Sequence, residues 1–324
     1  MPVSGPVRLQ FFPTFRCNRS CSFCFNREIG YHGRELDASG VRSLLSAAAE
    51  NNILELDILG GEPTLFEHLR LLIAEAVSRG IVVNLSTNGT NVGTLSELAS
   101  AFPREQLRIG VSLNEEPISP QLLEFIVSEK PLLKSVCRRS RTVPPFVHDL
   151  LQQSGIDFYL IFMDAFNGED LRESLPFPEY RRRLEDLQKS RANVHGVSCS
   201  GFLPESDADS APGIRCPAGT TKVSAMPDGT LFPCYLLFRY PEYRLGNILN
   251  SDIAALSSNP HLLLFRSFFQ NPCEAETCGY HGDCRGGCPA INRIITGDAD
   301  GGDIRCRTKP IRSINPAPAT NTVG

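Results

Sequence analysis

From residue 7 to about residue 190, the apolar residues follow two different patterns that alternate along the chain. Short apolar runs, typical of buried strands, are separated by longer segments in which apolar residues recur at the spacing of an amphipathic helix. Asp37 is placed to cap the first helix, and Gly80 to end the second. The expected strands are Val7–Phe12, Leu54–Leu59, Ile81–Ser86, Leu107–Leu113, Leu133–Cys137 and Phe158–Met163, and the expected helices are Ala38–Glu50, Phe66–Arg79, Thr94–Ala101, Pro120–Ser128, Pro144–Gln153 and Pro178–Ser190.

This regular alternation predicts an α/β fold with a parallel sheet and right-handed crossovers. Six strand–helix units are too few for a closed eight-stranded barrel. The sequence therefore predicts an open, partial (β/α)6 barrel of the TIM type over residues 1–199. Catalytic groups are expected at the carboxyl ends of its strands.

The pattern changes in the last third of the chain. Residues 200–215 are rich in Ser, Pro, Gly and Asp and are expected to form a linker or a lid. Residues 216–309 predict a small, loop-rich domain that holds seven of the twelve cysteines. The low-complexity residues 310–324 are expected to be a disordered tail.

Composition narrows the possible functions. The 324-residue chain has a net charge of −4, and its isoelectric point near 5.9 gives no electrostatic reason for binding nucleic acid. No apolar run approaches the ~20 residues that span a bilayer, and the first residues lack the features of a signal peptide. We therefore expect a cytoplasmic protein without a membrane partner, in which cysteines serve as metal ligands rather than disulfides.

Three of these cysteines follow the first expected strand in a single short loop. Cys17, Cys21 and Cys24 have the spacing C-x₃-C-x₂-C. A four-iron cluster needs four thiolates for full ligation, so three would leave one iron open to a small molecule. A structural zinc site is the alternative interpretation, but zinc prefers four closed ligands and no fourth Cys or His is adjacent.

The spacing of this loop, with Phe23 directly before the last cysteine, resembles the signature of the radical SAM superfamily. The resemblance implies that Cys17, Cys21 and Cys24 hold a [4Fe–4S] cluster whose open iron binds S-adenosylmethionine (SAM). It also implies that SAM is cleaved to a 5′-deoxyadenosyl radical, with the protein orienting the cofactors.

Further segments of the barrel match the superfamily at the ends of successive strands. Gly60-Gly61-Glu62-Pro63 resembles its GGEP motif, which receives the ammonium group of SAM. Polar residues that end the third and fourth strands suit the ribose or the methionyl carboxylate, and an arginine past the fifth strand suits that carboxylate. The implied SAM-binding residues are Phe23, Gly60, Gly61, Glu62, Pro63, Ser86, Thr87, Asn88, Ser112, Asn114 and Arg138.

The cysteines of the last third resemble the SPASM domain, an auxiliary iron–sulfur domain of radical SAM maturases. The resemblance assigns Cys273, Cys278, Cys284 and Cys306 to an outer [4Fe–4S] cluster, and Cys216, Cys234 and Cys288 to an inner one. Cys273-x₄-Cys278 departs from the family spacing of two residues. The inner set has three ligands, so either Cys199 completes it or one iron is open to substrate; the sequence favours the open site.

These features together predict an enzyme that oxidises a peptide or protein side chain by cross-linking, thioether formation or dehydrogenation. An external one-electron donor of the flavodoxin or ferredoxin type would reduce the first cluster. Tyr235, directly after Cys234, is a candidate relay for a proton or hydrogen atom. Oxidation of a small molecule (a sugar, an amino acid or a cofactor precursor) is an alternative, and a non-catalytic electron carrier is another.

Overall fold

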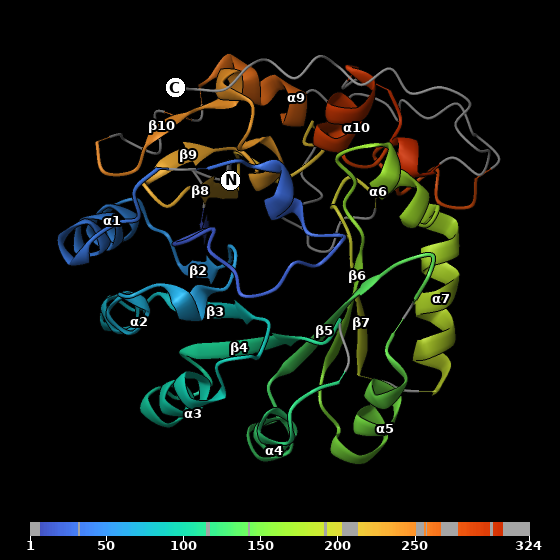
Figure 1. Ribbon diagram of the computed structural model, residues 1–324. Coiled ribbons are helices and arrows are strands. Elements are labelled where there is room, and N and C mark those ends of the chain that lie inside the picture. Colours follow the sequence, from blue (N-terminus) through green and yellow to red (C-terminus); the bar gives the residue numbers. More distant parts are fainter. Residues whose placement is uncertain are drawn as a thin grey trace.

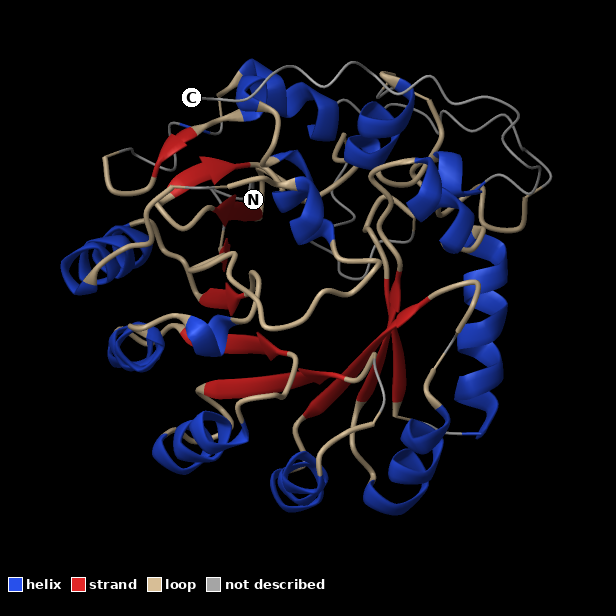
Figure 2. Cartoon of the chain, in the orientation of Figure 1, coloured by secondary structure: helices blue, strands red, loops and turns tan. Residues whose placement is uncertain are grey.

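The computed structural model describes residues 7–31, 33–114, 117–141, 143–190, 193–202, 213–250, 256, 258–266, 278–298 and 301–306. Its centre is a single sheet in the order β10-β9-β8-β1-β2-β3-β4-β5-β6-β7. The strands from β1 to β7 are parallel and curve into an open barrel with helices on its outer face (Figure 1, Figure 2).

The elements have the following bounds. The strands are β1 (Arg8–Phe11), β2 (Glu55–Ile58), β3 (Val82–Thr87), β4 (Leu107–Ser112), β5 (Leu132–Cys137), β6 (Phe158–Phe162), β7 (Val194–Val197), β8 (Lys222–Ala225), β9 (Thr230–Phe232) and β10 (Gly246–Asn247). The α-helices are α1 (Ala38–Glu50), α2 (Leu69–Ser78), α3 (Val92–Ala101), α4 (Pro120–Glu129), α5 (Pro145–Ser154), α6 (Gly168–Glu173), α7 (Phe177–Ser190), α9 (Leu263–Arg266) and α10 (Pro289–Thr296). The 3₁₀ turns are η1 (Phe25–Glu28), η2 (Pro63–Leu65), η3 (Tyr235–Leu237), η4 (Pro241–Tyr243), η5 (Pro260–Leu262) and η6 (Ile304–Cys306).

The six expected strands and six expected helices are all confirmed. The Asp37 side chain caps α1 by accepting a hydrogen bond from the backbone N–H of Gly40, as the sequence predicted. The barrel also has a seventh parallel strand, β7, which pairs with β6 and was not expected. The apolar pattern did not predict β7, because two of its four residues, His195 and Gly196, interrupt the apolar run.

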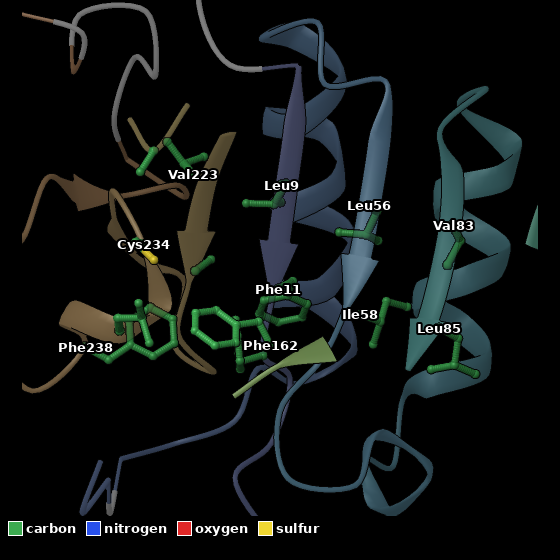
Figure 3. Close-up of a cluster of buried hydrophobic side chains, with 14 of the residues drawn as sticks. Leu9, Phe11, Leu56, Ile58, Val83, Leu85, Phe162, Val223, Cys234 and Phe238 are labelled. Carbon is green, nitrogen blue, oxygen red and sulfur yellow. The ribbon is translucent and has the colours of Figure 1, made fainter. Parts of the chain in front are cut away.

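The core follows the alternation of the strands. Buried and half-buried positions alternate along β2, β3, β5 and β6. Leu9, Leu56 and Val83 lie at one level of three neighbouring strands (Figure 3). Some of the half-buried positions carry polar side chains, such as Asp57, which accepts a hydrogen bond from Asn84. Across the described residues, no helix combines the length and apolar character needed to cross a membrane.

The C-terminal domain joins the barrel by extending its sheet. β8 pairs in parallel with β1, in the register Arg8↔Lys222 to Phe11↔Ala225. β9 and β10 continue the sheet in antiparallel pairs. Because β1 and β8 run in the same direction, the segments that follow them leave the sheet at the same end.

The chain directly after β7 is anchored on this C-terminal domain. The backbone carbonyl of Gly201 accepts hydrogen bonds from the N–H groups of Arg285 (2.9 Å) and Gly287 (2.8 Å). A side chain at residue 201 would place its Cβ 2.0 Å from the carbonyl oxygen of Gly287, so only glycine fits this contact. The fully buried ring of Phe202 stacks on Phe177, with 4.2 Å between the ring centroids.

Phe202→Ala tests how much this anchor stabilises the fold. Removing a fully buried ring leaves a cavity, and we expect the free energy of unfolding to fall by about 3–5 kcal/mol. Chemical denaturation of the metal-free, reduced protein measures it, with Leu263→Ala at a mostly exposed position as the control. Equal stability of the two variants would contradict the anchoring role.

Candidate functional site

The three-cysteine loop leaves the carboxyl end of β1 and is fastened to the loop that follows β2. The N–H of Gly61 donates to the carbonyl of Thr14 (2.9 Å), and the N–H of Glu62 donates to the carbonyl of Arg16 (2.8 Å). The guanidinium of Arg16 also forms two hydrogen bonds with the carboxylate of Glu35. The backbone leading into Cys17 is thus fixed before any cofactor binds.

The two glycines of the GGEP segment are required by this contact. Gly60 has a φ of +134°, which disfavours other residues, and a Cβ there would lie 2.4 Å from the carbonyl oxygen of Thr14. A Cβ at Gly61 would lie 2.1 Å from the carbonyl oxygen of Arg16. The two glycines therefore allow the backbone after β2 to approach the cysteine loop closely.

Glu62 is fully buried and joins three segments of the site. Its Oε1 accepts hydrogen bonds from the N–H and hydroxyl of Thr64 and from the hydroxyl of Thr87, and its Oε2 accepts one from the N–H of Asn88 (2.7 Å). Pro63 begins η2, with Glu62 as its N-cap. The carboxylate thus orients the end of β3 relative to the cysteine loop, while its predicted contact with the SAM ammonium stays a prediction.

The polar residues at the strand ends converge on the cysteine loop. The amide of Asn88 donates to Oδ1 of Asn18 (2.9 Å) and approaches Sγ of Cys17 at 3.9 Å. Ser86, one residue before Thr87, accepts a hydrogen bond from Nζ of Lys134. Burial lowers the pKa of Lys134 to about 8, against the opposing charges of Asp57 and Glu62.

The predicted positions on β4 are also at this end of the barrel. Ser112 is the last residue of β4, and Asn114 follows two residues later. Oδ1 of Asn114 accepts a hydrogen bond from the N–H of Val136 (2.8 Å), so this side chain extends the β4–β5 pairing. Its predicted contact with a ribose stays a prediction, and the side-chain NH₂ group of Asn114 is the group that would make it.

Arg138 lies where the sequence placed an anion-binding group. Its guanidinium lies over the ring of Phe23, 4.7 Å from the ring centroid. Its Nε is buried without a hydrogen-bond partner. A buried donor that is left unpaired is costly, so this position fits the carboxylate of a bound ligand.

Four thiols gather near the start of β8. The side chain of Cys199 hydrogen-bonds with those of Cys216 and Cys288. Cys216, Cys234 and Cys288 are buried, and Cys234 adjoins the apolar core beside Phe238 (Figure 3). The predicted inner ligands are thus brought together, and Cys199 joins them from two residues beyond β7.

A half-buried lysine that the sequence analysis missed, Lys222 at the start of β8, faces these thiols. Burial by itself lowers the pKa of Lys222, but charges on Cys216, Cys234 and Cys199 outweigh it and raise the pKa. Burial raises the pKa of Cys234 to about 12, with Lys222 acting in the opposite direction. An ammonium group at this place offsets the negative charge that a thiolate-ligated cluster brings.

The donor chemistry of the thiols suits an iron–sulfur cluster. A four-iron cluster carries one thiolate on each iron, so its ligands surround a larger body than one ion. The all-sulfur donor sets at both sites fit this group.

Aromatic contacts join the two cysteine sites. The ring of Phe25, directly after Cys24, contacts the ring of Tyr235, directly after Cys234, at 5.0 Å between centroids. Phe12 contacts Tyr235 as well, at 5.7 Å. The segments that directly follow Cys24 and Cys234 are therefore in contact.

The predicted outer ligands are described only in part. Cys273 lies outside the described residues, whereas Cys278 and Cys284 belong to one turn-rich segment, in which the N–H of Cys284 donates to the carbonyl of Tyr280 (2.7 Å). Cys306 ends η6. The outer set and the domain boundaries stay predictions, and the tail 310–324 and most of 200–215 also lie outside the described residues.

Comparison with known families agrees with this geometry. Residues 11–177, more than half of the chain, match the radical SAM superfamily, and residues 216–289 match an iron–sulfur cluster-binding domain, SPASM. The chain belongs to the radical SAM superfamily. Radical SAM domains bind a [4Fe–4S] cluster and SAM, and SPASM domains bind auxiliary iron–sulfur clusters, as the resemblance of the cysteine motifs implied.

Relatives of this radical SAM protein cover nearly its whole length. It is 37% identical to the PqqA peptide cyclase of Xanthomonas campestris pv. campestris, over 95% of this chain and 88% of that protein. It is 23% identical to the PqqA peptide cyclase of Methylorubrum extorquens, over 96% and 87% of the two chains.

Solved structures share the fold. SuiB of Streptococcus suis bound to S-adenosylmethionine has a TM-score of 0.72 at 20% identity, covering 94% of this chain and 78% of that chain. The enzyme anSMEcpe, bound to AdoMet and a Cp18Cys peptide, has a TM-score of 0.64 at 20% identity, covering 88% of this chain and 89% of that chain. These likenesses confirm a radical SAM barrel followed by a loop-rich C-terminal region.

Gly61→Ala tests the packing of the cysteine loop. The added methyl group would collide with the carbonyl of Arg16, so we expect the loop to shift and the three-cysteine site to lose most of its cluster. Electron paramagnetic resonance of the reduced, reconstituted protein measures that cluster, with and without SAM. Gly93→Ala in α3 meets no atom within 4 Å and is the control; normal cluster content in Gly61→Ala would refute the requirement.

Proposed function

We propose that this protein is a radical SAM/SPASM enzyme that oxidatively modifies a side chain of a peptide, forming a cross-link within it. The observation that carries the proposal is the contact between Phe25 and Tyr235, which joins the segments that directly follow Cys24 and Cys234. A peptide bound beside this contact would lie near both cysteine sites. The relatives named PqqA peptide cyclase support a peptide substrate, as does the likeness to SuiB bound to its precursor peptide SuiA.

The residues around the first site bind and orient the cofactors. When bound there, the cluster and SAM supply the 5′-deoxyadenosyl radical that removes a hydrogen atom from the substrate. Cys17, Cys21 and Cys24 hold the cluster, and Arg138 binds the methionyl carboxylate from its position over Phe23. Glu62 keeps the end of β3 in register with the cysteine loop through Thr87 and Asn88.

The inner site is a four-thiolate site completed by Cys199. The sequence favoured an open iron because Cys199 precedes a segment rich in Ser, Pro and Gly. Gly201 and Phe202, however, hold this part of the chain against the C-terminal domain, and Cys199 contacts Cys216 and Cys288. Full ligation favours an electron-accepting role for the inner site over direct substrate binding.

The proposed enzyme also needs an electron donor and an environment in which its thiols stay reduced. Reduction of the first cluster requires an external one-electron donor, for which a flavodoxin or ferredoxin is suited. A cytoplasmic location is proposed with it, because thiols stay reduced there and can serve as cluster ligands. A small-molecule substrate remains the second candidate, but no contact described above favours it.

Cysteine substitutions separate radical generation from product formation. Replacing Cys17, Cys21 and Cys24 with Ala should abolish reductive SAM cleavage, because no thiolate remains to hold the cluster. Cys284→Ala should leave SAM cleavage intact but stop peptide modification. Chromatography of 5′-deoxyadenosine, and mass spectrometry of a precursor peptide encoded near this gene and co-expressed with the enzyme, measure the two steps.

The controls for this experiment lie within the same chain. Cys137→Ala changes a fully buried cysteine on β5 and should leave both readouts unchanged. Full peptide modification by Cys284→Ala would contradict the role of the auxiliary sites. An unmodified peptide with the unaltered enzyme would shift the assignment to the small-molecule substrate.

Cys199→Ala tests the fourth ligand. With three four-iron clusters the reconstituted protein should hold ~12 iron atoms per chain, and the variant should lose ~4 of them. Iron and sulfide analysis with electron paramagnetic resonance measures the loss, and Cys137→Ala is again the matched control. An unchanged iron content and spectrum in Cys199→Ala would restore the open-iron alternative.

A further inference from the structure

A carboxylate at the carboxyl end of β6 connects residues that lie next to both auxiliary cysteine sets. Oδ2 of Asp164 accepts a hydrogen bond of 2.5 Å from the hydroxyl of Tyr235, the residue after Cys234. Oδ1 of Asp164 lies 3.6 Å from Nη1 of Arg305, the residue before Cys306. The sequence analysis did not single out Asp164 or Arg305.

Arg305 does not need Asp164 to balance its charge. Its side chain is 1% exposed and forms a 2.8 Å ion pair with the fully buried carboxylate of Asp303. Arg305 also donates to the carbonyl of Met163 (2.8 Å), and Asp303 accepts a hydrogen bond from the N–H of Cys288 (2.8 Å). The ion pair between Arg305 and Asp303 holds the guanidinium beside Asp164, and the Asp164 carboxylate can still accept a proton.

The Asp164 side chain remains 29% exposed, whereas that of its partner Arg305 in η6 is 1% exposed. Its position next to Tyr235 puts it at the same end of the barrel as the three-cysteine loop, through the contact between Tyr235 and Phe25. Asp164 and the three-cysteine loop are thus linked through the contacts of Tyr235.

Burial makes Asp164 a stronger base than a surface carboxylate. Burial raises its pKa above the usual range, and Asp303 adds to this effect, whereas Arg305, Lys222 and the hydrogen bond from Tyr235 act in the opposite direction. Burial and the nearby Asp164 raise the pKa of Tyr235 well above its ordinary value, so the phenol stays protonated and donates to the carboxylate.

We propose that Asp164 accepts the proton that the substrate releases when it gives an electron to the inner cysteine site, with Tyr235 as the positioning residue. The inference rests on the proposed function, with the iron–sulfur cluster of the inner site as the electron acceptor. It assigns a catalytic base to the barrel rather than to the cysteine-rich domain.

Hydrogen abstraction by the 5′-deoxyadenosyl radical leaves one unpaired electron on a substrate carbon. A neighbouring group of the substrate then loses its proton to Oδ of Asp164, and the electron pair of the broken bond joins the unpaired electron. Two of the three electrons form the new bond to carbon, and the third passes to the inner site.

The test follows the inner cluster of the reconstituted holoprotein and needs no substrate. If Asp164 takes up a proton when this cluster is reduced, the midpoint potential should fall as the pH rises through the pKa of Asp164, which is above the usual ~3.9 for Asp. Redox titration from pH 5 to 9, followed by electron paramagnetic resonance, measures this slope in the unaltered protein and in Asp164→Asn.

We expect the slope to disappear in Asp164→Asn while the rate of 5′-deoxyadenosine formation from SAM and dithionite is kept. Asp157→Asn alters a half-exposed aspartate paired with His195 before β6 and should keep the slope. An unchanged slope in Asp164→Asn overturns the inference, and so does its loss in Asp157→Asn.

Tyr235→Phe gives a second, independent measurement if the first variant does not assemble its clusters. The hydrogen bond from Tyr235 lowers the pKa of Asp164, so its loss should move the pH-dependent region to higher pH without removing it. No movement of this region overturns the inference. Since no peptide is involved, a failure of the proposed peptide modification leaves these results unaffected.

Discussion

The parallel pairing of β1 with β8 is the constraint on which the rest of the molecule depends. It joins residues 8–11 to residues 222–225 and continues the barrel sheet into the cysteine-rich domain. β1 leads directly into the three-cysteine loop, and the β8–β9 hairpin leads directly to Cys234. Because β9 runs antiparallel to β8, the chain returns toward the start of β8 at Cys234, and the ring of Tyr235 then contacts Phe12 and Phe25 beside the three-cysteine loop. The extended sheet thus brings the two cysteine segments into contact.

Around this frame the site is rigid because backbone groups, rather than long side chains, make the closest contacts. The carbonyls of Thr14 and Arg16 accept hydrogen bonds from the N–H groups of Gly61 and Glu62. The carboxylate of Glu62 in turn accepts hydrogen bonds from the hydroxyl of Thr87 and the N–H of Asn88. Each bond spans segments that are distant in sequence. Cofactor binding thus requires little further ordering of the chain, and less conformational entropy is lost.

The sequence predicted the barrel and the cysteine sets because both leave local signals. The hydrophobic periodicity of a strand or helix lies within that one segment, and the cysteine spacing lies within short loops. β7 escaped notice because its run of four residues contains glycine and histidine. The contacts of Cys199 depend on how Gly201 packs against Gly287, which no local pattern encodes. Asp164 follows a predicted strand, but its significance comes from Tyr235 and Arg305, which only folding brings near.

The origin of the inner thiols has a consequence for how the protein matures. One thiol comes from the end of the barrel, at Cys199, and the others come from the domain that is synthesised after it. The group of four is complete only when the last barrel strand and the segment up to Cys288 are both in place. If Cys199 is the fourth ligand, as proposed above, a chain truncated before Cys288 cannot present all four thiols. Iron loading at this site would then depend on the completion and folding of both the barrel and the C-terminal segment.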